Sequence, residues 1–397
     1  MCGVLNKHLF SFQFRNLGYL LFSLVYLLRL FGWKIVLLFI SHGCAVFFAS
    51  TFCNSAVVWA TSLGLMCTIN FDQSQTLINS LMTSNENKEE NLYLITLELV
   101  KVNLKCTSFC LEKVNNQLSN SSNQNASFGY NKCKKHTTNH TDISSRSHSS
   151  AMNGGQLPPT SSELNKSFQS DKPSDHYGLL DLFQYMFYFS LLFCAPFVTY
   201  NIFNSQINSN PLPWNRRKLY DTIFVFLRIA FWAFIVEFSL HHLYFSAMMF
   251  NPYILKRVSH CTLMGIGYLQ GQFKMVKYLV FYSLTGQMAG LEGIEVPGPP
   301  SCISYIYRYS QMWKLFDKGI YNFTKRYIYI PLGGYKAGLP RKLFGSFLCF
   351  MFFYNYHGLD VYLLIWCLLN FAELVIEVCA SLLENTPAVQ TLEASII

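Results

Sequence analysis

His357 is the residue of this sequence whose type and setting most strongly suggest chemistry. It stands between one apolar run that ends at Tyr356 and another that starts at Leu359. Ionisable groups at membrane depth are costly to bury and commonly serve a function. Imidazole, with an unperturbed pKa of about 6.5, also suits proton transfer at neutral pH. We therefore predict that His357 transfers a proton, and we leave open the alternative of a histidine that packs between helices and bonds a carbonyl group.

Asp317, upstream of His357, is the second candidate because it interrupts an apolar stripe. The stripe recurs at helical spacing and comprises Trp313, Phe316, Ile320 and Phe323. A carboxylate on such a face needs a partner, since burying an unpaired charge is expensive. A bound substrate or His357 would be a functional partner. The sequence by itself favours a structural salt bridge to one of the neighbouring basic residues, which are Lys314, Lys318, Lys325 and Arg326.

The composition shows what kind of element must position these residues. Of the 397 residues 51% are hydrophobic, 17% are aromatic and only 13% are charged, whereas soluble domains carry about 25% charged residues. Apolar stretches of about 17–25 residues are long enough to cross a bilayer. The formal net charge of +9 comes from basic clusters beside apolar segments, which predicts cytosolic loops rather than binding of nucleic acid. The predicted fold is an all-α bundle of transmembrane helices.

The chain divides into three parts by composition. Residues 1–114 hold apolar runs at 17–31 and 35–69, and an amphipathic segment at 92–114 that is predicted to lie on the membrane interface. Residues 115–175 are rich in Ser and Asn and poor in large apolar residues, so we predict a disordered loop. The part from 176 to 397 has long apolar stretches at 179–200, 219–250, 262–283, 343–356 and 359–383.

A longer pattern joins the two candidate residues. It reads Met312-Trp, then Asp317, then Arg326-Tyr-Ile-Tyr-Ile-Pro-Leu-Gly-Gly334, and is followed by His357-Gly358. This pattern resembles the signature of the membrane-bound O-acyltransferase family, and the likeness is strongest from about residue 290 to residue 383. Within the family it is most similar to the branch that acylates Hedgehog-type signalling proteins, and less similar to the glycerol-uptake-protein branch.

The resemblance implies both a fold and a reaction. The fold would be a multi-helix bundle with re-entrant segments and a central tunnel for the acyl chain. The reaction would move a palmitoyl group from palmitoyl-CoA to the N-terminal cysteine of a secreted signalling protein, at the endoplasmic reticulum membrane. The implied partners are therefore acyl-CoA, a secreted protein that begins with Cys, and membrane lipids.

The resemblance also implies roles for individual residues. His357 and Asp317 would be the catalytic pair that meets beside the tunnel, and Trp313 would line the path of the acyl donor. Cys302 matches a position that ligates the iron of haem b, for which a thiolate is a sound axial ligand, although a lone cysteine here is also consistent with a plain structural residue. From charge alone, Lys325 and Arg326 are predicted to bind the phosphates of coenzyme A.

The sequence departs from the family pattern at two points. Tyr356 precedes His357 where the family commonly has Trp, and the chain ends at Ile397 where relatives usually continue, so the last helices are expected to be absent. Three other functions stay open. One is an O-acyltransferase that acts on a lipid or a GPI anchor. Another is a non-catalytic regulator, against which the presence of His357 argues. The third is a transporter with a proton relay, although no inverted repeat is visible.

Overall fold

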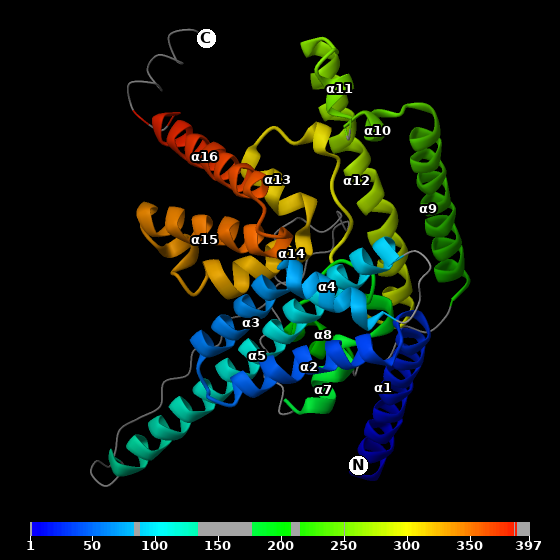
Figure 1. The fold of residues 1–397 in the computed structure, drawn as a ribbon. Coiled ribbons are helices and arrows are strands. Elements are labelled where there is room, and N and C mark those ends of the chain that lie inside the picture. Colours follow the sequence, from blue (N-terminus) through cyan, green and yellow to red (C-terminus); the bar gives the residue numbers. More distant parts are fainter. Residues whose placement is uncertain are drawn as a thin grey trace, which may run out of the picture.

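The computed structural model describes residues 2–82, 88–133, 177–207, 215–249, 251–384 and 386. Within these ranges every regular element is a helix, which confirms the predicted all-α class (Figure 1). Four helices of this described part are long and apolar enough to cross a membrane, and they contain Phe14–Phe31, Trp33–Ser50, Leu219–His242 and Val361–Glu384. The predicted polytopic membrane character is therefore confirmed.

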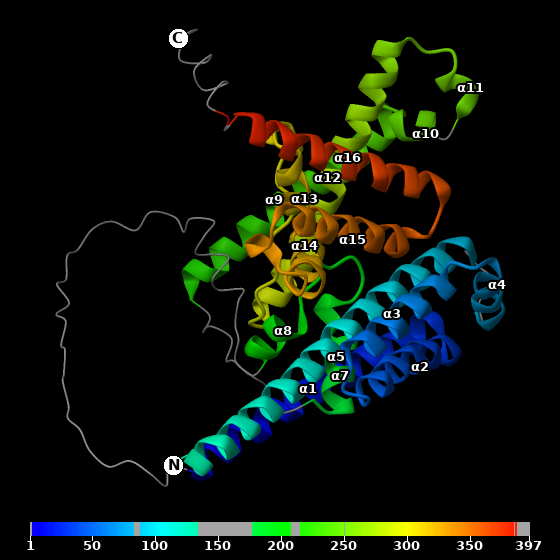
Figure 2. The same cartoon turned by 90° about the vertical axis from the view of Figure 1, so that its left-hand side faces the viewer.

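The first half of the chain is built around one long helix, α5. Helices α2 and α3 pack along α5, and all three lie side by side in both views (Figures 1 and 2). The break before α2 falls at Gly32, whose φ of 82° suits glycine. The Asn54 side chain caps α3 by accepting a hydrogen bond from the Ala56 backbone N–H. The helices of this half are α1 (Cys2–Phe31), α2 (Trp33–Ser50), α3 (Ser55–Ile69), α4 (Asp72–Leu81) and α5 (Lys88–Cys133).

The position of α5 corrects two expectations. The segment at 92–114 does not lie on an interface, because residues 102–114 are all buried among neighbouring elements. The polar side chains from Asn103 to Lys113 find hydrogen-bond partners inside the protein, which is why an amphipathic sequence can occupy the core. In addition, α5 continues to Cys133, into the part that we predicted to be a disordered loop. The remainder of that predicted loop, 134–176, lies outside the described residues.

The apolar stretch at 179–200 does not form one membrane helix. It folds instead into α7 (Leu179–Met186), the 3₁₀ turn η1 (Phe189–Leu191) and an irregular segment that leads to α8 (Tyr200–Ile207). Pro196 lies in the irregular segment and lacks the N–H that a helix would use, and Cys194 has a φ of 50°. Most of this stretch is nevertheless buried in the core. A continuous apolar run therefore marks burial here, and not a spanning helix.

The second half contains the elements that carry the candidate site. Helices α9 and α12 pack together, as do α15 and α16, which Figure 2 shows side by side. The helices of this half are α9 (Arg216–His242), α10 (Phe245–Met249), α11 (Pro252–Leu255), α12 (His260–Leu291), α13 (Tyr309–Phe316), α14 (Lys318–Thr324), α15 (Leu339–His357) and α16 (Val361–Glu384). The short turns are η2 (Ile303–Tyr305), the π-helical turn η3 (Lys325–Tyr329) and η4 (Gly334–Lys336).

One close backbone approach fixes α14 against the irregular segment before α8. A Cβ atom on Gly319 would lie 2.4 Å from the carbonyl oxygen of Phe197 and 2.7 Å from its backbone nitrogen. Only glycine allows the two backbones to come this close. Because Gly319 is two residues after Asp317, this contact also sets the position of that carboxylate.

Candidate active site

Asp317 occupies the single non-helical position between α13 and α14, where it caps α14. Its Oδ1 accepts a hydrogen bond from the Ile320 backbone N–H at 3.0 Å, and its Oδ2 accepts one from the Tyr282 hydroxyl at 2.8 Å. The salt bridge favoured by the sequence is wrong, since within the described part of the chain Asp317 makes none. Lys318 turns away and donates to the carbonyl oxygen of Pro299 at 3.1 Å. The carboxylate is thus held by neutral donors.

His357 is the last residue of α15 and lies in a group of aromatic rings. Its ring centroid is 4.9 Å from that of Tyr356, 6.3 Å from that of Phe353 and 6.4 Å from that of Trp366. The helix ends here because Gly358 adopts a φ of 127°, a conformation that favours glycine. His357 is exposed as a residue. A ring oriented by aromatic neighbours and still accessible can exchange a proton with a ligand.

Trp313 belongs to the same aromatic group. Its ring lies 5.1 Å from Phe353 and 5.5 Å from Trp366, measured between centroids, and both rings also contact His357. Edge and tilted packing of this kind is favourable beyond simple burial. The structure therefore brings Trp313 and His357 together through shared neighbours, although they come from α13 and α15.

Helix α12 links the His357 region to Asp317. Lys274, Tyr278 and Tyr282 recur every fourth residue and so share one face of the helix. The charge of Lys274 acts on His357, whereas both tyrosines lie near Asp317. Eight residues of helix rise about 12 Å, and the described structure contains no direct hydrogen bond between Asp317 and His357. Lys274, Tyr278 and Tyr282 thus form a polar track along α12, from the His357 region to Asp317.

Tyr278 and Tyr282 are not predicted as site residues by the sequence pattern. Their hydroxyl groups are informative only because α12 turns them toward Asp317, and the spacing from Lys274 is the one signal that the sequence offers. Tyr356 was treated as a replacement for tryptophan, yet it too lies within range of the Asp317 charge. Tyrosine hydroxyls can donate or accept hydrogen bonds, so this track can hold polar ligand atoms.

Arg326, a predicted phosphate ligand, already has a partner. Its Nε and Nη2 donate to the two carboxylate oxygens of Glu112 at 2.6 and 3.2 Å, the forked geometry that makes such pairs strong. The Tyr327 hydroxyl donates to the same carboxylate at 2.7 Å. Glu112, on α5, was not selected from the sequence. Lys325 lies 5.8 Å from the centroid of the Tyr321 ring.

Cys302, the predicted haem ligand, stands at the start of η2. Its thiol is exposed, and the neighbouring Tyr305 and Tyr307 are 88% and 82% exposed. An axial thiolate needs a covered apolar pocket for the macrocycle, and this turn does not provide one. Among the described residues no three His, Cys, Asp or Glu side chains are grouped as a metal site. The residues present do not fit a haem group, and no step below uses one.

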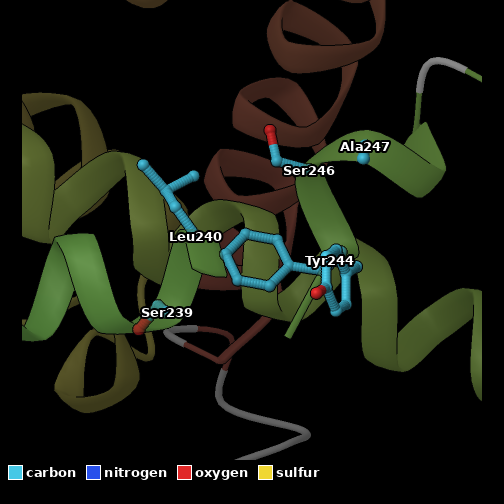
Figure 3. A pocket seen from close by; sticks show the side chains of 6 residues that line it. Ser239, Leu240, Tyr244, Ser246 and Ala247 are labelled. Atoms are coloured by element: carbon cyan, nitrogen blue, oxygen red, sulfur yellow. The ribbon is translucent and has the colours of Figure 1, made fainter. Parts of the chain in front are cut away.

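A cavity of about 300 Å³ lies away from these residues, where α9 meets α10. Figure 3 shows Leu240, Ser239, Tyr244 and Ser246 around this cavity. Neither Asp317 nor His357 lines this cavity. It therefore has no part in the site described above.

Comparison with known proteins agrees with the fold. The all-α fold with spanning helices defines an integral membrane protein. The model of the membrane-bound O-acyltransferase family matches residues 84–392, which is most of the chain, and the protein belongs to that family.

Several curated relatives are similar over about half of the chain. Protein-cysteine N-palmitoyltransferase HHAT of Mus musculus is 31% identical over 209 residues, which cover 53% of this chain and 42% of the relative. Protein-cysteine N-palmitoyltransferase Rasp of Drosophila melanogaster is 30% identical over 227 residues, covering 57% and 44%. Membrane-bound O-acyltransferase GUP1 of Millerozyma farinosa is 26% identical over 196 residues, covering 49% and 38%. The matches thus span less than half the length of these relatives.

Proposed function

We propose that this protein is a membrane-embedded acyltransferase that moves a palmitoyl group from palmitoyl-CoA to the N-terminal cysteine of a secreted Hedgehog-type signalling protein. The observation that carries the proposal is the similarity to two protein-cysteine N-palmitoyltransferases at 31% and 30% identity. The matched part of the chain includes the helices that hold Asp317 and His357. A secreted acceptor passes through the endoplasmic reticulum, so we propose that membrane as the location.

In the proposed reaction the amino group of the acceptor attacks the thioester carbon. A new C–N bond forms, the C–S bond breaks, and coenzyme A leaves as a thiolate. An N-terminal amine has a pKa of about 8 and must lose protons to react. A neutral His357 imidazole takes a proton during the attack and returns it to the leaving thiolate, which is general base and then general acid catalysis. The exposure of His357 supports this role.

Asp317 has three conceivable roles, namely orienting His357, stabilising its cation or positioning the amine. Its hydrogen bonds to Tyr282 and Ile320, together with the absence of a direct bond to His357 in the described structure, favour the third. A carboxylate held by neutral donors keeps its charge available to an incoming ammonium group. We therefore propose that Asp317 binds the acceptor amine before the proton transfer.

The acyl chain is proposed to lie along the aromatic group around Trp313. Each buried methylene of the chain contributes about 0.8 kcal/mol, so apolar rings hold a palmitoyl group without dedicated polar contacts. Lys325 is the proposed contact for the phosphates of coenzyme A. Arg326 would first have to leave Glu112, so we assign it a secondary role.

The proposal is tested with purified full-length protein, labelled palmitoyl-CoA and a peptide that begins with Cys. The expected product is the peptide acylated at its N-terminus, identified by mass spectrometry. A control peptide with an acetylated N-terminus and Cys replaced by Ser should stay unmodified. If no amine or hydroxyl acceptor is acylated by an otherwise folded protein, the enzymatic proposal is wrong.

A second function has some support. Similarity to membrane-bound O-acyltransferase GUP1 favours transfer to a hydroxyl group, such as that of a lipid or a GPI anchor. The same assay with a lysophospholipid in place of the peptide distinguishes the two. Acylation of the lipid without acylation of the peptide would favour this alternative.

A further inference from the structure

Glu98 and Lys101 are two buried ionisable residues on α5 that the mechanism above does not use. Glu98 is 1% exposed. Both of its carboxylate oxygens, and the Nζ of Lys101, are buried without a hydrogen-bond partner among the described residues. The two residues are one helical turn apart and so lie on the same side of α5. They form a buried acceptor and donor pair whose bonds are unmade.

Unpartnered burial of this kind is unusual in α5. Lys105, one turn further on the same side, donates to the carbonyl oxygens of Met186 and Leu191, both at 2.9 Å. Buried polar groups are nearly always hydrogen-bonded, and a buried polar group without a hydrogen bond costs free energy, even where, as here, the charge of Lys105 lies near Glu98. The interior of this protein supplies hydrogen-bond partners for Lys105, yet it supplies none for the carboxylate of Glu98 or the Nζ of Lys101 among the described residues. A ligand is the natural source of the missing bonds.

Glu98 and Lys101 face the region of the candidate site. The charge of Lys101 acts on Asp317, and the charge of Glu98 acts on Tyr356, the residue before His357. Asn91 and Ile95 precede Glu98 on the same side of α5, and they line a cavity of about 590 Å³. Glu98 and Lys101 do not line this cavity, but they follow Ile95 along the same side of α5 by about one and two turns.

We propose that Glu98 and Lys101 recognise the N-terminal residue of the acceptor. Glu98 accepts hydrogen bonds from its free amino group in the initial complex, before that group reaches Asp317, and Lys101 donates to its carbonyl oxygen. An N-terminal residue carries these donor and acceptor groups side by side, whereas the hydroxyl group of a lipid brings no positive charge to offset a buried carboxylate. The inference deepens the proposed function, on which it rests, because it selects an amine acceptor next to a carbonyl group.

The decisive experiment measures binding without acyl-CoA, so that it does not depend on catalysis. Full-length protein in nanodiscs is titrated with a Cys-initiated peptide and with the matching peptide in which the amino group is replaced by hydrogen. Charge-assisted hydrogen bonds of this kind change affinity about 10- to 100-fold. Wild-type protein should bind the amine peptide more tightly by that factor. Equal affinity for the two peptides would overturn the proposal.

Variants locate the effect in the two residues. Glu98→Gln should weaken binding of the amine peptide and leave binding of the des-amino peptide nearly unchanged, so that the ratio of the two affinities falls toward one, whereas a merely structural role would weaken both and preserve the ratio. Lys101→Met should weaken both by a common factor, and Lys101→Arg should restore binding. Glu90→Gln, at an exposed position of the same helix, is the matched control and should behave as wild type. The thermal transition of each variant shows whether it is folded, and the wild-type peptide comparison holds without any variant.

The outcomes separate this inference from the proposed function. Amine-selective binding that Glu98→Gln abolishes, with no acyl transfer, supports the recognition site and contradicts the enzymatic proposal. If the protein acylates the peptide and Glu98→Gln leaves this transfer and the amine selectivity of binding unchanged, the enzymatic proposal is supported and the recognition site is contradicted.

Discussion

The two ends of the buried part of α5 differ in whether their polar side chains have hydrogen-bond partners. Toward the C-terminus every one is paired: Asn103 with Ser62, Lys105 with two carbonyl groups, Ser108 with Tyr327 and Glu112 with Arg326. Toward the N-terminus Glu98 and Lys101 lack hydrogen-bond partners within the described structure. The comparison teaches that burial of an ionisable group marks packing when its bonds are made, and marks a site when they are not. Variants of the first kind should lose stability, and those at the site should lose activity.

The largest expected effect is on activity. His357→Ala removes the proposed general base and should lower acyl transfer about 1000-fold, within the range of about 10²–10⁴ that such catalysis supplies. The thermal transition should stay close to that of wild type. His241→Ala, on the exposed end of α9, is the matched control. Retention of more than a small part of the activity in His357→Ala would assign proton transfer to another group.

The second largest effect is expected on stability, at the Glu112–Arg326 pair near the C-terminal end of the buried part of α5. Glu112→Ala leaves the Arg326 guanidinium without its carboxylate, and breaking a buried pair in this way costs about 3–5 kcal/mol. The variant should unfold at a markedly lower temperature or denaturant concentration. Removing both partners, in Glu112→Ala with Arg326→Met, should recover part of the loss. A stable Glu112→Ala protein with impaired transfer would place this pair in the site. The distinction between a structural end and a functional end of α5 would then be wrong.

Asp317 allows the charge to be separated from the helix cap. Asp317→Asn keeps an oxygen for the Ile320 N–H, so stability should be retained while transfer falls about 100-fold through loss of a charged contact. Asp317→Ala also removes the cap and should cost about 1 kcal/mol more in the free energy of unfolding. Both quantities follow from an activity assay and a melt on the same preparation. Equal activity of Asn and Asp at this position would exclude a role for the charge.

A smaller effect is expected at Trp313. In Trp313→Leu the side chain stays apolar but loses its ring contacts with Phe353 and Trp366, which are worth about 0.5–1.5 kcal/mol. The KM for palmitoyl-CoA should rise about three- to tenfold by that estimate, with little change for a short-chain acyl-CoA. Phe224→Leu, at an exposed position of α9, serves as the control. An equal rise for both donors would place Trp313 outside the acyl path.

The smallest effect is expected at Cys302. Because its thiol is exposed, Cys302→Ala should change stability and transfer by no more than about twofold, as is usual for surface positions. The absorption spectrum of the purified wild-type protein is the second measurement. A haem band that is present in wild type and lost in Cys302→Ala would show that the turn around η2 closes over a cofactor.

The sequence predicts the spanning helices more reliably than the core. The stretch at 219–250 is apolar over a length that only a spanning helix uses. The helix α9 occupies it as far as His242, and α10 follows at Phe245–Met249. The stretch at 179–200 is equally apolar, but a buried irregular segment and a helix share that pattern. Pro196 lies in this stretch, and the chain around it leaves helical geometry altogether.

The polar part of the site was harder to predict because it depends on helix rotation. Charged residues at Glu98 and Lys101 suggested a helix on the membrane surface, since the sequence does not show that other helices surround α5. Tyr282 had no distinguishing neighbour in the sequence, and its bond to Asp317 exists only because α12 passes the start of α14. Asp317, Trp313 and His357 could be selected because they belong to one pattern along the chain.

The close approach of Gly319 to the Phe197 peptide limits what this position can accept. Even a methyl group would occupy the space of main-chain atoms, which, unlike side chains, cannot rotate aside. Raising overall stability elsewhere does not create that space. A saturation library at residue 319 should therefore return glycine alone, in a stabilised background as well as in the native one.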